Sequence, residues 1–416
     1  MRIVYLTQSY PPMISGAALF VQQVAEAMTQ RGHQVLVIAA SDRDHPYLVQ
    51  NGNLTVLRLQ SIYNPMRVGQ RFLLYPRREV MKALHDFHPE VIHVHEPLQI
   101  GLLGIEYAAR ADIPSILTIH QLPSFVASYL PNLFKAYVET VLWAYARWLS
   151  QKFTSILTPS QTISTLVTEM TGLPANTIGY GMDLHTFRPL LSCDEDIAIR
   201  QKWDLPPGVP ILLHVGRLDA EKRVDHIIHA AARTLKETDA HLLIIGDGTQ
   251  KPALIKLCKS LGITARVHFP GYISKEDGLP EIYRIASLFV TASEIETQGI
   301  VLLEAAASGL PIVAVRATCI PEIVHHGING YLAESADFNG LSNGMSMLLK
   351  DPQKAKLMGR ASLALAAKHD LHYTNNAHDQ LYSQLVRQVR TQRVEAETGF
   401  PYRFWKRMKA WTSFSK

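Results

Sequence analysis

Short apolar runs alternate with longer amphipathic segments along most of the chain. The runs in the first half carry few polar residues, which is typical of strands buried on both faces of a parallel sheet. They read "RIVYLT", "QVLVIAA", "VIHVH", "SILTIH" and "SILTPS". Helical segments separate them, such as "AALFVQQVAEAMTQRG", whose final Gly32 suits a helix C-terminus. The pattern predicts a doubly wound α/β domain.

The alternation pauses over residues 188–210, which we interpret as a loop, and then begins again. The second series of apolar runs reads "PILLHVG", "AHLLIIG", "RVHFPG", "SLFVTAS" and "PIVAV". Two series predict two doubly wound, Rossmann-like domains that face each other across a cleft. We expect these domains over 1–187 and 188–368, followed by C-terminal helices over 369–416 that return to the first domain. Because ligands bind beyond the carboxyl ends of parallel strands, the cleft is the expected site.

Composition fits a folded protein of this size and narrows its location. The 416 residues are 47% hydrophobic and 19% charged, with no low-complexity tract. Three widely separated cysteines without a CxxC pair argue against a disulfide framework or a zinc site, and fit a reducing cytosol. No secretory signal and no apolar run of about 18 residues is evident. We expect a cytoplasmic protein that is soluble or lies on a membrane surface.

The net charge of +5 is concentrated at the C-terminus. The final segment, "FPYRFWKRMKAWTSFSK", carries five basic residues and no acidic residue. Its charge therefore equals the net charge of the whole chain. The positive charge is therefore a property of this tail and not of a broad nucleic-acid-binding surface, and we expect no nucleic-acid partner.

The stretch "HVGRLDAEKRVDHIIHAA" is a candidate phosphate site. A strand ends at Gly216, Arg217 follows it, and Lys222 lies five residues later near a helix start. A fork of N–H donors, a point charge and a helix dipole together suit a diphosphate. The alternative is a solvated turn with an incidental ion pair to Glu221.

The stretch "LLIIGDGTQKPAL" resembles a dinucleotide loop but lacks its last glycine. Gly246 and Gly248 are present, whereas Lys251 occupies the third glycine position of GxGxxG. This disfavours an NAD-dependent dehydrogenase. We interpret the two glycines as permitting a tight turn close to a ligand.

Two glutamates, Glu296 and Glu304, flank Gly299 and an apolar helical run. On one helix an eight-residue spacing corresponds to about 12 Å. Glycosidase carboxyl pairs lie about 5 to 9.5 Å apart, so two contacts along one elongated ligand fit better than a hydrolytic pair. Glu304 lies inside "VLLEAAA", where no polar face is evident, which favours a buried carboxylate with a partner. The alternative is a dipole-stabilising Glu296 and a surface Glu304.

Histidines at strand ends form a further group of candidates. His93 and His95 share one face of the strand in "EVIHVHEP", but no third ligand with metal-site spacing follows, so we expect no metal. His120 ends the strand "SILTIH" and is expected to point into the cleft. The Asp-x-Asp triplets at 42–44 and 194–196 lie in stretches interpreted as polar loops, and neither is interpreted as a metal site.

Taken together, these segments resemble the family 4 retaining glycosyltransferases of the GT-B fold. The resemblance covers nearly the whole chain, through "YPPMISGAALFVQQVAEAMTQRGHQVLVIA", "HPEVIHVHEP", "IPSILTIH", "GMDLHTFRP", "GRLDAEKRVD", "IIGDG", "ETQGIVLLEAAASGLPIVAV" and "PEIVHHGINGYL". The resemblance implies a catalytic set of His120, Arg217, Lys222 and Glu296. It also implies nucleotide-sugar contacts at Gly16, Gly216, Arg217, Lys222, Gly246, Gln298, Gly299, Ile300 and Glu304.

Within that resemblance, each charged residue has a distinct implied role. Arg217 and Lys222 would bind the donor diphosphate, and Glu304 would hold the ribose hydroxyls. Glu296, with the backbone of residues 298–300, would meet the sugar and the phosphate, while His120 would contact the sugar near the reacting centre. Transfer would proceed with retention, with the leaving phosphate as base and with no metal or other cofactor.

Three glycine positions of the family are occupied by other residues here. The glycine pair of the N-terminal loop is Ser15-Gly16, a pair before "PEIV" is Thr318-Cys319, and the glycine after Glu-Lys is Arg223. None of these differences removes a charged role, so we expect an active enzyme.

The acceptor implied by the resemblance is a membrane lipid. The stretches "ETQGIVLLEAAASGLP" and "IHQLPSFVASYLP" resemble the branch that glycosylates diacylglycerol, and UDP-glucose is the leading donor. Interleaved aromatic and basic residues of the tail suit an anionic membrane: Phe404, Trp405, Lys406, Arg407 and Trp411. A second basic cluster comprises Arg67, Arg71, Arg77, Arg78 and Lys82. We expect a peripheral enzyme on the inner face of the plasma membrane.

Several alternatives stay open at this stage. For the tail, the alternative is a helix that packs on the first domain. For the acceptor, the alternative is a soluble or polyprenyl-linked glycan, and UDP-galactose and GDP-mannose are the other candidate donors. A sugar-nucleotide epimerase and an inactive nucleotide-binding scaffold are the remaining hypotheses.

Overall fold

The computed structural model describes residues 1–13, 15–63, 71–73, 75–96, 98–127 and 131–412, with the side chains of 126, 132 and 394–412 excepted. Its described residues form two compact units. The first comprises Met1–His120, Arg147–Leu157 and Asn375–Lys416, and the second Gln121–Ala146 and Thr158–Thr374.

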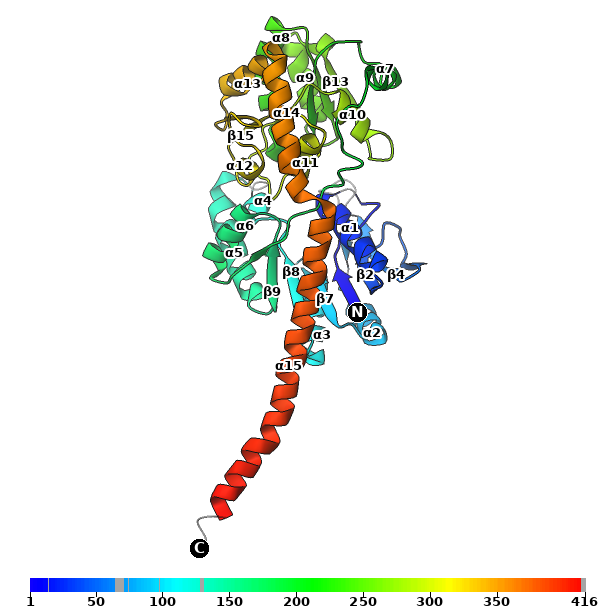
Figure 1. Ribbon diagram of the computed structural model, residues 1–416, viewed down its shortest axis with the longest axis vertical. Helices are drawn as coiled ribbons and strands as arrows, with labels where there is room; N and C mark the ends of the chain where they lie inside the picture. The colour runs from blue at the N-terminus through cyan, green and yellow to red at the C-terminus, as the bar shows by residue number, and fades with distance from the viewer. Residues whose placement is uncertain (14, 64–70, 74, 97, 128–130, 413–416) are drawn as a thin grey trace. The chain divides into compact units, whose positions relative to one another are not determined.

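The first unit is built on a mainly parallel sheet with helices packed against it (Figure 1). Its strands follow the order β9-β8-β7-β1-β2-β4-β3, in which only β3 and β4 pair antiparallel. The strands are β1 (Arg2–Leu6), β2 (Gln34–Ala40), β3 (Tyr47–Asn51), β4 (Leu54–Leu59), β7 (Val91–Val94), β8 (Ser115–Thr118) and β9 (Ser155–Thr158), with a separate hairpin of β5 (Ser61–Tyr63) and β6 (Arg71–Leu73). The helices are α1 (Gly16–Gln30), α2 (Arg77–Phe87) and α3 (Gln99–Ala111).

The second unit contains a parallel sheet in the order β13-β12-β11-β14-β15-β16, the doubly wound order that reverses beside β11. Its strands are β11 (Ile211–Val215), β12 (His241–Ile245), β13 (Val267–Gly271), β14 (Leu288–Thr291), β15 (Ile312–Val315) and β16 (Gly330–Ala333). The helices are α4 (Pro123–Ala127), α6 (Gln161–Thr171), α7 (Cys193–Lys202), α8 (Val224–Glu237), α9 (Lys251–Ser260), α10 (Leu279–Ile285), α11 (Ile300–Ala307), α12 (Ile320–Ile323), α13 (Phe338–Lys350) and α14 (Pro352–Ala366). Short elements are β10 (Asn176–Thr177), η1 (Ala220–Lys222), η2 (Thr264–Arg266) and η3 (Ala367–His369). The predicted pair of Rossmann-like domains is confirmed.

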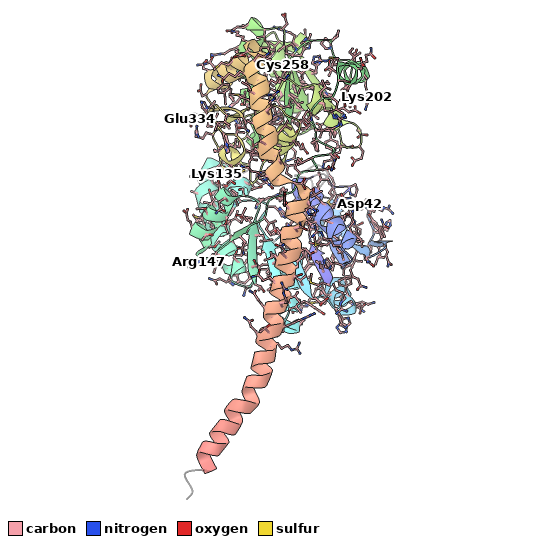
Figure 2. All side chains as sticks on the ribbon, in the orientation of Figure 1. Asp42, Lys135, Arg147, Lys202, Cys258 and Glu334 are labelled. Atoms are coloured by element: carbon pink, nitrogen blue, oxygen red, sulfur yellow. The ribbon has the colours of Figure 1, made fainter. Side chains whose placement is uncertain are left out.

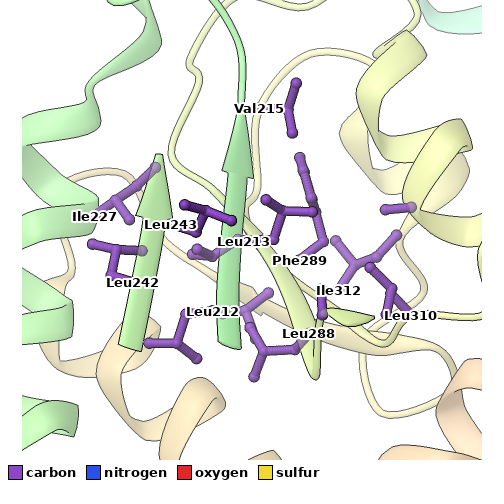
Figure 3. Packing of buried hydrophobic residues seen from close by; sticks show 14 of the residues in the cluster. Leu212, Leu213, Val215, Ile227, Leu242, Leu243, Leu288, Phe289, Leu310 and Ile312 are labelled. Atoms are coloured by element: carbon purple, nitrogen blue, oxygen red, sulfur yellow. The ribbon is translucent and has the colours of Figure 1, made fainter. Parts of the chain in front are cut away.

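Burial of the apolar strands explains why both sheets form. Figure 3 shows the core of the second unit, where side chains of β11, β12, β14 and β15 meet α8. Leu213, Leu242 and Phe289 are 0% exposed there. Burying one such side chain stabilises the fold by about 1.5 to 3 kcal/mol. The absence of polar positions in these strands is therefore the pattern that a sheet covered on both faces requires.

Two helices span the division between the units in sequence. Helix α5 (Asn132–Ser150) contributes residues to both, and α15 (Leu371–Thr412) belongs to the first unit from Asn375 onward. Within the first unit α15 is held by polar contacts: the hydroxyls of Tyr382 and Tyr5 lie 3.2 Å apart, and Asp379 lies 3.0 Å from the His33 ring.

The expectation of a loop over 188–210 is wrong, because this stretch contains α7. The Ser192 hydroxyl caps the helix by accepting the Glu195 amide, and Asp194 and Asp196 lie in the first turn. Carboxylates are favoured there by the helix dipole, and Ser-x-x-Glu is a helix-start signature that periodicity alone overlooks. The second Asp-x-Asp triplet is therefore a helix terminus and not a loop.

Candidate functional site

The loop after β11 presents the two cations predicted to bind phosphate. The Arg217 guanidinium donates to Asp219 Oδ2 and to Glu221 Oε1, each at 2.5 Å, and its side chain is 40% exposed. The Glu221 side chain is only 2% exposed, so it orients the arginine from below. The contact is thus a buried support for Arg217, rather than the incidental surface pair considered as the alternative.

Gly246 and Gly248 are required by the neighbouring loop. A Cβ on Gly246 would lie 1.9 Å from the Gly216 carbonyl oxygen, and one on Gly248 would lie 2.6 Å from the Leu218 backbone. Because the loop after β12 packs directly against the loop after β11, any larger residue would displace the backbone that carries Arg217. The glycines therefore have a structural role that does not depend on a ligand.

Lys222 and Glu296 form an ion pair in the second unit. Lys222 Nζ donates to Glu296 Oε1 at 2.5 Å and lies 3.5 Å from the Ser293 hydroxyl. The two side chains are 18% and 14% exposed, so the pair is partly shielded from solvent. The Glu296 amide donates to the Thr318 hydroxyl at 3.0 Å, which fixes the loop before α11. A cation and an anion are thereby held together at the carboxyl end of β14.

Helix α11 begins directly after Gly299, as the sequence predicts. Gly299 has φ of 77°, and a Cβ there would lie 2.7 Å from Leu302 Cδ1. The Gln298 side chain is buried and pairs with the Tyr180 backbone, accepting its N–H at 2.6 Å. Since the first amides of a helix have no acceptor within the helix, the backbone from Ile300 is suited to an anion.

Glu304 is buried within α11 and has a partner, as expected from its apolar surroundings. It is 6% exposed, and the Tyr283 hydroxyl donates to its Oε2 at 2.9 Å. Burial raises the pKa of Glu304 to about 7, while Lys275 and the Tyr283 hydrogen bond act in the opposite direction. Tyr283 is itself 0% exposed and packs edge-on against Phe187.

Two of the non-glycine replacements keep a backbone conformation that favours glycine. Arg223 has φ of 46° and Thr318 has φ of 39°, both in the left-handed region. This conformation costs a residue with a Cβ about 1 kcal/mol or more. The Thr318 hydroxyl compensates locally by accepting the Glu296 amide. The backbone shape around the charged residues is therefore preserved without the glycines.

His120 lies at the carboxyl end of β8 and contacts a second histidine. His120 Nε2 and His95 Nδ1 share a hydrogen bond of 2.9 Å, and the two rings stack with centroids 5.2 Å apart. Phe20 of α1 packs edge-on against both rings. Burial lowers the pKa of His120 to about 3 and that of His95 well below its ordinary value. Both imidazoles are therefore neutral at physiological pH.

Gly16 is the first residue of α1, one turn before Phe20. The preceding Ser15 caps the helix, with its hydroxyl accepting the Ala18 amide at 3.0 Å. The serine in place of a glycine thus stabilises the helix start. Gly16 and His120 are brought to the same end of the first unit's sheet, because Phe20 links α1 to the His120 ring.

The structure also describes the surroundings of His93, the first histidine of the strand in "EVIHVHEP". His93 bonds to Thr118 at 2.7 Å and to Tyr382 at 2.8 Å, so it serves the core. Among the described residues, no three His, Cys, Asp or Glu side chains gather as a metal site, and no helix is long and apolar enough to cross a membrane.

The two basic regions, the N-terminal cluster over 67–82 and the C-terminal tail, are described to different extents. Arg71 pairs with Asp44 at 2.8 Å and Arg77 pairs with Glu106, so part of the N-terminal cluster is neutralised. Arg67 lies outside the described residues. In the tail, the backbone is helical to Thr412, whereas the side chains of Phe404, Trp405, Lys406, Arg407 and Trp411 lie outside the described part.

Two models of glycosyltransferase families match separate stretches of the chain. The model of glycosyl transferases group 1 matches residues 195–363, and the model of glycosyltransferase family 4 matches residues 14–185. This chain is a family 4 glycosyltransferase of the GT-B fold. The first match falls on the region with Arg217, Lys222, Glu296 and Glu304.

This glycosyltransferase has relatives that differ in the sugar named. It is 29% identical to a GDP-mannose-dependent alpha-mannosyltransferase of Mycobacterium tuberculosis, over 87% of this chain and 92% of that one. It is 26% identical to the alpha-monoglucosyldiacylglycerol synthase of Acholeplasma laidlawii, over 87% and 91%. The solved structure of Anabaena HepE in complex with UDP-glucose superimposes with a TM-score of 0.75, at 20% identity over 92% and 100%, which shows the shared fold.

Sequence reasoning missed the supporting roles of several residues in the candidate site of this glycosyltransferase. Tyr283, Glu221 and His95 hold Glu304, Arg217 and His120 in position, respectively. No motif indicates Tyr283. His95 was weighed only as a metal ligand, although its place on alternate positions with His93 was a signal that it faces the same side of the sheet.

Proposed function

We propose that this glycosyltransferase transfers a hexose, with UDP-glucose as the first donor to test, from a nucleotide sugar to a membrane lipid such as diacylglycerol. Transfer proceeds with retention and without a metal ion. The observation that carries the proposal is the set of charges in the second unit: two cations at strand ends, the start of α11, and a separate buried carboxylate.

The donor's charge distribution fits that set. Arg217 offers a planar fork of donors suited to phosphate oxygens, and Lys222 adds a compact charge. The start of α11 adds backbone donors and its dipole. Glu304 accepts the hydroxyl protons of the ribose, since an ionised carboxylate is an acceptor on both oxygens.

Binding of the donor rearranges the ion pair. Glu296 occupies Lys222 at 2.5 Å, so an incoming diphosphate must compete with that carboxylate. Once the phosphate takes Lys222, Glu296 becomes available to accept hydroxyl protons of the sugar. The exchange couples arrival of the phosphate to capture of the sugar.

The reaction needs stabilisation of a leaving group rather than a protein nucleophile. The bond between the anomeric carbon and the diphosphate oxygen breaks while the acceptor oxygen bonds to the same face. The acceptor's proton passes to the departing diphosphate, whose charge Arg217, Lys222 and the helix start stabilise. His120 is neutral because its pKa is lowered to about 3, so it acts as a hydrogen-bonding group for the sugar and not as a proton carrier.

The proposed donor and acceptor are supported by the proteins to which this chain is similar. A glucosyldiacylglycerol synthase and a neighbour bound to UDP-glucose favour glucose and a lipid. The mannosyltransferase relative makes GDP-mannose transfer the second candidate. A soluble or polyprenyl-linked glycan is the other acceptor class, and an epimerase would convert a UDP-sugar with no acceptor.

A donor panel separates these functions. The purified protein is incubated with UDP-glucose, UDP-galactose and GDP-mannose, and nucleotide release is measured with and without diacylglycerol, polyprenyl phosphate or free sugars. We expect UDP release from UDP-glucose that rises with diacylglycerol and yields an α-linked glycolipid by NMR. Isomerisation without acceptor indicates an epimerase, and binding without turnover indicates a scaffold.

Site variants test the assigned roles. We expect Glu304→Ala to weaken nucleotide binding and His120→Ala to slow turnover with little effect on donor affinity. Isothermal titration with UDP and steady-state kinetics measure the two effects. Unchanged parameters in both variants contradict the assignment.

A further inference from the structure

Helix α5 exposes apolar side chains along one face. Leu133 is 84% exposed, Tyr137 72%, Val141 48% and Trp148 47%. Their spacing of four, four and seven residues puts them on a single side of an α-helix, together with Ala144, which is also exposed. A helix at the surface of a globular protein ordinarily turns polar residues toward solvent, whereas this solvent-facing side of α5 is apolar. We call it the α5 face, defined by Leu133, Tyr137, Val141, Ala144 and Trp148.

The charged residues of α5 and of the turn after it that lie beside the α5 face are of one sign. Arg147 and Lys152 are exposed beside Trp148, and the Lys152 ammonium lies 4.6 Å from the centre of its indole ring. Figure 2 labels Lys135 and Arg147 on this helix, of which only Arg147 lies beside the α5 face, because Lys135 falls on the opposite side of the helical wheel from Tyr137. The one acidic residue of α5, Glu139, falls on the opposite side of the helical wheel from Tyr137. The face therefore combines apolar and aromatic residues with cations and without an acid.

This combination matches the boundary of a lipid bilayer. Trp and Tyr are enriched there because an apolar ring and a polar edge meet both environments. Adjacent Lys and Arg add about 1 kcal/mol each near an anionic leaflet. An interfacial helix has an apolar face and a cationic rim, which describes α5. A protein partner with an apolar surface would gain less from the excess of positive charge than an anionic bilayer does.

We propose that the α5 face is a docking surface for an anionic membrane, with Tyr137, Val141 and Trp148 entering the headgroup region. This deepens the proposed function, on which it rests for its purpose, since a diacylglycerol acceptor resides in the membrane. The docking surface is distinct from the tail, which the sequence alone suggested.

Vesicle co-sedimentation of the full chain tests the proposal. The protein is mixed with vesicles of phosphatidylcholine alone or with phosphatidylglycerol added. We expect the triple variant Tyr137→Gln, Val141→Gln, Trp148→Gln to bind anionic vesicles at least about tenfold less, because three apolar side chains no longer leave water. A matched control replaces Ile255, Met347 and Leu357 with Gln. These residues are exposed to 44%, 45% and 63%, and the control should bind like the parent.

The cationic rim is tested separately. Arg147→Gln with Lys152→Gln should weaken binding to anionic vesicles by about fivefold or more, with little change on neutral vesicles. Circular dichroism and UDP binding check that every variant is folded. If the triple variant does not fold, hydrogen exchange of the parent decides: added anionic vesicles should increase protection over residues 132–150.

Three results overturn the proposal: equal vesicle binding by the triple variant and the parent, no added protection over 132–150, or a dimer of the parent that the triple variant dissociates while vesicle binding persists. The last result makes the face a contact between copies. Donor and acceptor specificity is measured independently in detergent. Vesicle binding through α5 without lipid glycosylation therefore refutes the proposed function alone, and transfer to diacylglycerol without α5-dependent binding refutes only the docking surface.

Discussion

Replacing Glu304 with Gln should stabilise the protein while it impairs nucleotide binding. Burial raises the pKa of Glu304 from 4.5 to about 7, so the folded state holds its proton more tightly than the unfolded state. Below pH 4.5 the carboxyl is protonated in both states and affects stability little. Between pH 4.5 and 7 the folded state progressively loses stability, because the carboxyl ionises in the unfolded state while the buried group keeps its proton. Above pH 7 both states are ionised and the loss is constant.

The size of this effect follows from the pKa shift. The two pKa values differ by about 2.5, and at about 1.4 kcal/mol per pKa unit this difference corresponds to about 3.5 kcal/mol at pH 8. Glutamine keeps the shape and an acceptor for the Tyr283 hydroxyl but carries no charge. We therefore expect Glu304→Gln to raise the free energy of unfolding by up to about 3.5 kcal/mol at pH 8, with almost no change at pH 4.5.

Urea unfolding monitored by fluorescence at several pH values measures the difference. The same variant should bind UDP about tenfold or more weakly at pH 8, because it loses a charge-assisted hydrogen bond to the ribose. UDP affinity of the parent should fall as pH drops below about 7, whereas that of the variant should stay flat. A parent and a variant with parallel stability curves across this pH range would refute the reasoning.

Further predictions concern the supporting contacts. His95→Leu should lower kcat about tenfold by leaving His120 without its ring partner, and His95→Asn should lower kcat less. His93→Leu should lower Tm with kcat and KM unchanged. An equal loss of kcat in all three variants excludes a positioning role for His95. Glu296→Gln should tighten UDP binding about fivefold by releasing Lys222, yet slow turnover with the donor; weaker UDP binding contradicts the exchange of partners. Chelation with EDTA should leave the rate of sugar transfer unchanged, and a loss restored by one divalent cation would show a metal requirement.

Local pattern was sufficient to predict most strands and the start of α11. The strands are continuous apolar runs, and Gly299 interrupts the chain before an alanine-rich helix. The same approach failed at 188–210, because polar residues at a helix start resemble those of a loop until the Ser192 cap is recognised. Propensity is a weak guide where one cap decides the structure.

Burial of Glu304 was predictable, but its partner was not. Its apolar neighbours in sequence already argued for burial. Tyr283 lies 21 residues away on α10, and only the packing of that helix beside α11 brings its hydroxyl within 2.9 Å. The pKa of Glu304 depends on the same packing, since desolvation is a property of the surrounding volume and not of the adjacent residues.

The sequence by itself determined the α/β class, the buried strands and the residue types that suit a nucleotide sugar, because these depend on local periodicity and on the chemistry of individual side chains. Tertiary structure decided the rest: the strand order, the support of Arg217 by buried Glu221, the bond between His95 and His120, and the pairing of Lys222 with Glu296 across 74 residues. It also turned the apolar side of α5 to solvent. Contacts between distant residues arise only when sheets and helices are packed, and a linear pattern does not contain that geometry.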